Sequence, residues 1–181
     1  MQSRTRSRAV LAFLASALSL IAAGCGGSSD KKANEAYANS VCTAIGNWQT
    51  QVKSLATGIS GKPTQASIQA KATQFETDTK NLVNEIKTIP PPDTSEGQAA
   101  KQQLDQLGTD LTNTVNAVKS GLSAIQANPS AATIAAAIST LTPQLQSLQK
   151  TGKSAVSSLQ QVGGSLADAF KNTDSCKSLS S

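Results

Sequence analysis

Hydrophobic residues recur at spacings of three and four through four stretches of the chain. None of these stretches alternates apolar and polar residues with the period of two that is typical of a β-strand. Spacings of three and four place the apolar residues on one face of a helix and leave Gln, Lys, Ser and Thr on the other. The four predicted apolar faces consist of Tyr37, Val41, Ile45, Trp48, Val52, Leu55 and Ile59; Ile68, Ala72, Phe75, Thr79, Leu82, Ile86 and Ile89; Leu104, Leu107, Leu111, Val115, Val118, Leu122 and Ile125; and Ile134, Ile138, Leu141, Leu145, Leu148, Val156, Leu159, Val162, Leu166 and Phe170.

Three breaks rich in Gly and Pro separate the stretches, at residues 58–63, 90–93 and 128–129. Short breaks between long amphipathic helices favour antiparallel neighbours. The fold class predicted is therefore all-α, an antiparallel up-down-up-down four-helix bundle. We expect the bundle to occupy residues 34–176 and residues 177–181 to form a C-terminal tail.

Local signals refine the helix ends. Pro143 predicts that the fourth helix is kinked or split near this residue, since proline lacks an amide donor and clashes with the preceding turn. Gly163-Gly164 is a second weak point in the same helix. Asp93 with Glu96 predicts a capping box at the start of the third helix, and Asn128 predicts an N-cap for the fourth.

The N-terminus has the pattern of an export signal. Arg4, Arg6 and Arg8 precede an uncharged run over residues 9–23. This run is shorter than the roughly 20 residues that a transmembrane helix needs. A basic segment followed by such an apolar run is typical of a secretory signal peptide, which we assign to residues 1–24 and exclude from the fold.

The end of the signal, Ile21-Ala22-Ala23-Gly24-Cys25, resembles the lipobox of bacterial lipoprotein precursors, although Ala22 stands where Leu is usual. In that family the cysteine thiol receives a diacylglyceryl group, and a dedicated signal peptidase then cuts just before it. The resemblance implies lipid attachment at Cys25 and a location on the extracytoplasmic side of the cell membrane. Residues 25–33 are then expected to be a lipidated N-terminus and flexible tether. The alternatives are a secreted protein cut after Ala23 and an uncleaved anchor.

Removal of residues 1–24 changes the charge balance of the protein. The remaining chain has thirteen Lys, no Arg and eleven acidic residues, so its net side-chain charge is 13 − 11 = +2. Without Arg, bidentate recognition of phosphate or guanine is not available, and we expect no nucleic-acid partner. The whole chain lacks His, and Met1 is its only Met. We therefore expect no metal, no cofactor and no enzymatic activity.

The three cysteines have separate expected roles. With Cys25 committed to lipid, Cys42 and Cys176 remain as an even pair in an exported protein and predict a structural disulfide. A redox-active pair is the alternative, but the Cys-x-x-Cys spacing that tunes thiol pKa is missing. Trp48 and Tyr37 fit the apolar face of the first helix. The alternative for both aromatic rings is contact with a ligand or partner.

These observations favour a non-catalytic lipoprotein that acts as an interaction, scaffold or envelope-associated module. Its expected partners are membrane lipid, through N-terminal acylation, and an envelope protein. Turns around Ser60 and Asn128 are expected to form a contact surface far from the membrane. Because many positions facing the core are Ala or Thr, the alternative is a carrier that holds a hydrophobic ligand between the helices.

Overall fold

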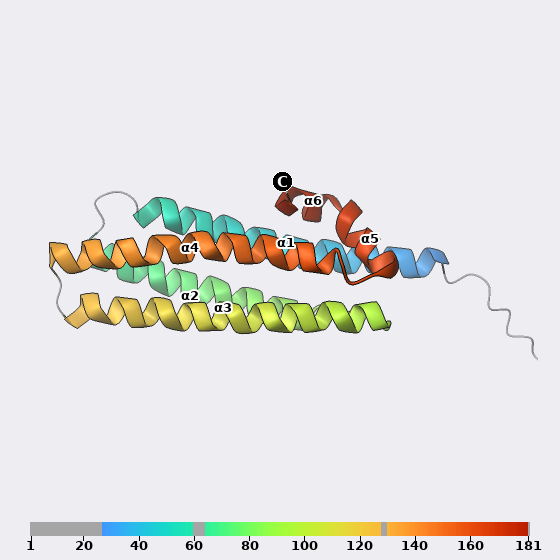
Figure 1. Ribbon diagram of the computed structural model, residues 1–181, viewed down its shortest axis with the longest axis horizontal. Coiled ribbons are helices and arrows are strands. Elements are labelled where there is room, and N and C mark those ends of the chain that lie inside the picture. The colour runs from blue at the N-terminus through green and yellow to red at the C-terminus, as the bar shows by residue number, and fades with distance from the viewer. Residues whose placement is uncertain (1–26, 60–63, 128–129, 181) are drawn as a thin grey trace, which may run out of the picture.

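The computed structural model describes residues 27–59, 64–127 and 130–180, and within these ranges the chain is helical without any strand (Figure 1). The all-α prediction is therefore confirmed. The helices of the described ranges are α1 (Gly27–Ile59), α2 (Gln65–Thr88), α3 (Ser95–Ala127), α4 (Ala131–Leu159), α5 (Gly164–Asn172) and α6 (Asp174–Ser180).

The four long helices form the predicted antiparallel bundle. Each of α1 to α4 packs against the next in sequence, and α4 packs against α1, which closes the ring of neighbours. The end of the bundle at which α1 and α3 finish is also the end at which α2 and α4 begin (Figure 1). We call this the far end, because it is remote from the first residues of α1.

The core is built from the apolar faces that the spacing predicts. Trp48, Phe170 and Ile45 are among its largest fully buried side chains. Some residues of the predicted faces are only partly buried at the edge of the core, and the side chains of Ile59 and Ile125 lie outside the described part of the chain. The partly buried ones are Ala72, Ile89, Ile134, Ile138 and Val162.

The predicted split of the fourth helix at Pro143 is wrong. Helix α4 runs without interruption from Ala131 to Leu159 with Pro143 inside it. The proline lies on the exposed face, while Leu141 and Leu145 on either side are buried in the core. Burial of these leucines stabilises the helix on both sides of Pro143, and this tertiary packing outweighs the loss of one backbone hydrogen bond.

The break in the chain occurs instead at the second weak point. Gly163 and Gly164 have φ angles of 97° and 56°, in the left-handed region that glycine adopts without steric cost. A second change of direction follows at Thr173, which has an extended backbone. Helices α5 and α6 therefore fold back along α1 and α4 (Figure 1).

Both ends of the predicted bundle need correction. Residues 177–181 were expected to be a tail, but α6 continues to Ser180 and Leu179 is buried. The expected tether, residues 25–33, is already helical from Gly27 onward. The predicted signal peptide and Cys25 lie outside the described residues. Within the described ranges, no helix combines the length and the apolar character needed to cross a bilayer.

The helix caps lie one or two residues from the predicted positions. Before α3, the Thr94 hydroxyl, rather than the Asp93 carboxylate, accepts the hydrogen bond from the Gly97 amide, at 3.0 Å. Before α4, Ser130 forms a reciprocal capping box with Thr133. A hydroxyl can fill the same role as a carboxylate or an amide oxygen at an N-cap, so the residue type alone does not fix the register.

Candidate functional site

A disulfide joins α1 to α6, the last helix of the described chain. Cys42 of α1 and Cys176 of α6 are bonded, with a Cα–Cα distance of 5.0 Å and a sequence separation of 134. The predicted pairing is therefore confirmed. Both cysteines are buried, at 1% and 0% exposure. A bond enclosed in this way suits a structural role, because thiol–disulfide exchange needs access to a sulfur atom.

Helix α5 is attached to the start of α1 beside this disulfide. The Asn34 side-chain amide donates to the Ser165 hydroxyl at 2.8 Å, and Asn34 is only 5% exposed. The Tyr37 and Phe170 rings meet edge to face, with centroids 6.0 Å apart. Sequence reasoning missed the role of Asn34 because it is polar. Its spacing of three from Tyr37, on the same helical face, is the signal that could have identified it.

Trp48 lies in the middle of the bundle and is 2% exposed. Its indole Nε1 donates to the Thr79 hydroxyl at 3.1 Å, which links α1 to α2 inside the core. Tyr37 is also buried, at 5% exposure. Neither aromatic ring is presented on the surface for a ligand or partner. The geometry agrees with core packing for both rings.

Burial also affects the Tyr37 phenol. Desolvation, with a smaller contribution from the Asp105 carboxylate, raises the pKa of Tyr37 from 10.0 to about 12. The folded protein therefore favours the neutral phenol more strongly than the unfolded chain does. The stability that this preference provides is complete below pH 10 and is lost as the pH rises toward 12.

We expect the free energy of unfolding to fall by about 2–3 kcal/mol between pH 10 and pH 12 from this group, at roughly 1.4 kcal/mol per pKa unit. Urea denaturation across this range measures the loss. Lysines also titrate there, so Tyr37→Phe is the control that isolates the phenol. A variant that loses as much stability as the wild type would contradict the assignment to Tyr37.

A hollow with an apolar lining lies between α1 and α2, about one helical turn beyond Trp48 along α1. Its apolar lining comes from Val52, Leu55 and Phe75, and polar side chains surround them. Its volume is 190 Å³. Pockets for drug-sized ligands typically measure about 300–1,000 Å³. This hollow is smaller than the cavity that the alternative of a hydrophobic-ligand carrier requires.

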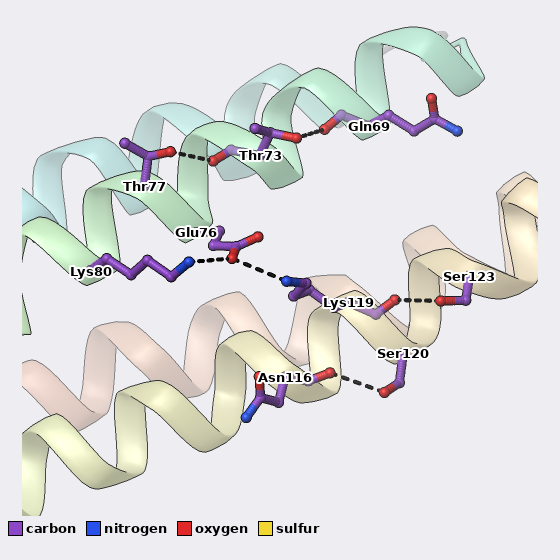
Figure 2. A network of polar contacts seen from close by, with 9 residues as sticks. All are labelled: Gln69, Thr73, Glu76, Thr77, Lys80, Asn116, Lys119, Ser120 and Ser123. Atoms are coloured by element: carbon purple, nitrogen blue, oxygen red, sulfur yellow. Dashed lines mark hydrogen bonds and ion pairs between the residues drawn. The ribbon is translucent and has the colours of Figure 1, made fainter.

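A charged network crosses the outer surface between α2 and α3. Figure 2 shows Glu76 between Lys80 of its own helix and Lys119 of α3. The two ammonium groups donate to Glu76 Oε1 at 2.7 and 3.0 Å. The hydrogen bond from Lys80, followed by that from Lys119, lowers the pKa of Glu76 below its usual value. The Glu76 carboxylate is therefore held ionised and links two helices.

Other acidic side chains of α2 and α3 are also surface groups. Asp105 pairs with Lys101 one turn away on α3, and Asp110 accepts a hydrogen bond from Gln106. Asp78 accepts one from Gln74 in the same way. In the part of the chain that the structure describes, no three His, Cys, Asp or Glu side chains are grouped to hold a metal ion.

No protein-family model, no curated protein and no solved structure matches the chain.

Proposed function

We propose that the protein is an extracytoplasmic lipoprotein anchored to the cell membrane through acylated Cys25. Its helical bundle is non-catalytic and acts as an interaction or scaffold module of the envelope. The observation that carries the proposal is the N-terminal pattern: three arginines, an apolar run over residues 9–23, and small residues leading directly to Cys25. Two or more acyl chains give stable anchoring, whereas one holds a protein only marginally.

The position of α1 supports this proposal. The helix begins at Gly27, two residues after Cys25. A helix of 33 residues spans about 50 Å at 1.5 Å per residue. With Cys25 in the membrane, a bundle of this length would project its far end well beyond the lipid surface. The turns expected at Ser60 and Asn128 lie outside the described residues.

The side-chain chemistry also favours an interaction module over an enzyme. Glu76 is engaged by two lysines, and Asp105 by one, as surface ion pairs. General acid–base catalysis instead uses carboxyl groups whose pKa values are brought near the working pH. The core is filled by apolar side chains and the Trp48–Thr79 hydrogen bond. A packed bundle of this kind suits a scaffold that presents its surface to a partner.

Metabolic labelling with a palmitate analogue tests the anchor. We expect the wild-type protein to incorporate the label and Cys25→Ala to lose it completely. The matched control is the double variant Cys42→Ala, Cys176→Ala, which removes the other two cysteines and should keep the label. Persistence of the label in Cys25→Ala would refute lipid attachment at Cys25.

A further inference from the structure

Another hollow lies on the outer surface between α2 and α3, beside the Glu76 network that Figure 2 shows. Its volume is 210 Å³. The Glu76–Lys119 ion pair lies at its side nearer the far end, because Glu76 is the first α2 residue of its lining and Lys119 the last α3 residue. This ion pair and the packing of α2 against α3 hold the two walls of the hollow together.

The inner lining of this hollow includes two valines and one buried hydroxyl. Thr79 and Val115 are 1% and 5% exposed, and Val83 is partly buried. The Thr79 hydroxyl accepts the hydrogen bond from the Trp48 indole, and in the described part of the chain its own proton is donated to no acceptor. A buried donor without a partner costs free energy, and a hydroxyl proton can rotate to reach an acceptor. An oxygen atom of a ligand in the hollow would satisfy it.

The exposed rim of the hollow offers two carboxamides. Asn84 of α2 and Asn116 of α3 are both exposed, and neither side chain bonds to another group within the described ranges. Each carboxamide presents donors and an acceptor. The charged groups of the rim are already engaged, since Lys80 and Lys119 both donate to the same oxygen of Glu76. The neutral carboxamides are therefore the groups left to meet a ligand.

We propose that this hollow binds one neutral sugar ring, either as a free sugar or as a unit of an envelope polysaccharide. Each ring hydroxyl donates and accepts hydrogen bonds, as the carboxamides of Asn84 and Asn116 do. One sugar oxygen accepts the proton of Thr79, and Val83 and Val115 contact the C–H face of the ring. The inference deepens the proposed function and rests on it for the polysaccharide source, since an extracytoplasmic bundle meets such polymers.

Size and charge favour this ligand over the alternatives. The hollow equals the volume of about seven liquid waters at roughly 30 Å³ each, which suits one ring and not a longer ligand. A purely apolar ligand would cover the Thr79 hydroxyl without offering it an acceptor. An anion would have to compete with Glu76 for Lys80 and Lys119. A neutral ligand with several hydroxyls meets neither cost.

Nuclear magnetic resonance titration of the ¹⁵N-labelled mature protein tests the proposal, in a polyoxyethylene detergent whose headgroup contains no sugar. The neutral probes are methyl glucoside and N-acetylglucosamine, with galacturonate as the anionic probe and cyclohexanol as the apolar one. We expect a neutral sugar to shift the backbone amide signals of Val83 and Val115, with a dissociation constant of about 1–10 mM. Added salt should leave this affinity unchanged, because the contacts involve no charged group of the ligand.

The pattern across the probes decides the ligand class. Binding of dextran at the same signals would assign the site to a polysaccharide unit, and binding of the small sugars without dextran would assign it to free sugar. No shift with either neutral sugar, or tighter binding of galacturonate or cyclohexanol than of both, would overturn the proposal.

Two pairs of substitutions assign the binding to the hollow. Asn84→Ala with Asn116→Ala should weaken it about tenfold, because the hydrogen bonds of both carboxamides are lost. The matched control is Asn81→Ala with Asn113→Ala, which changes exposed asparagines of the same two helices outside the lining and should alter affinity less than about twofold. Equal losses in the two pairs would contradict the assignment.

Circular dichroism of each variant checks that the bundle remains folded. The mass of the extracted protein reports its lipidation separately. A lipidated protein that binds no neutral sugar contradicts the sugar site alone, and an unlipidated protein that binds contradicts the anchor alone.

Discussion

Replacing both Cys42 and Cys176 by Ala lowers the free energy of unfolding by about 4–5 kcal/mol. This upper-end value comes from the chain-entropy model for a loop of more than 100 residues, and the bond here spans 134 positions. Without the bond, α6 keeps only its own short contacts with α1, α4 and α5. The unfolded chain also gains conformational entropy, because the disulfide no longer closes the long loop.

Urea denaturation followed by circular dichroism measures this loss. Reduced wild-type protein should unfold at the same urea concentration as the double variant, since both lack the bond. Cys25→Ala is the matched control and should leave the midpoint unchanged, because Cys25 precedes the bundle. A loss smaller than about 1 kcal/mol in the double variant would mean that α5 and α6 hold to the bundle by packing alone.

Trp48→Ala lowers the free energy of unfolding by about 4 kcal/mol, within the range for large aromatic residues truncated in a core. The side chain is only 2% exposed, so its removal leaves a cavity between α1 and α2. It also removes the partner of the buried Thr79 hydroxyl. An unpaired buried hydroxyl adds to the cost of the cavity.

Two further variants divide this effect into its parts. Thr79→Val keeps the indole and removes the hydrogen bond, and should cost about 1 kcal/mol. Trp48→Phe keeps most of the apolar volume and should cost less than Trp48→Ala. Circular dichroism is the suitable signal, since Trp48 is the only tryptophan and its fluorescence disappears with it. Similar stability in Trp48→Ala and the wild type would contradict the packing described here.

The main bundle could be predicted from sequence because its helices obey one simple rule. Leucines and other apolar residues at spacings of three and four identified the buried faces, and the breaks at residues 58–63 and 90–93 gave the antiparallel order. The disulfide was predictable for a different reason. Once Cys25 is assigned to lipid, Cys42 and Cys176 leave a single pairing.

The folding of α5 and α6 back along α1 and α4 could not be predicted in the same way. Val162, Leu166 and Phe170 continue the spacing of the fourth helix, so the apolar pattern alone predicted no reversal. The Gly163-Gly164 pair marked a weak point in the helix but did not show in which direction the chain continues. Apolar spacing records which face is buried and says nothing of the direction of the next helix. At Pro143 the sequence predicted a break that does not occur. Helix α4 continues through this residue, because the buried Leu141 and Leu145 stabilise the helix on either side of it.

The most direct test of the anchored lipoprotein is the mass of its N-terminal peptide after extraction from membranes. The account predicts a chain that begins at Cys25 and carries a diacylglyceryl group on the thiol. An unmodified chain that begins at Gly24, or one that retains residues 1–24, would contradict it.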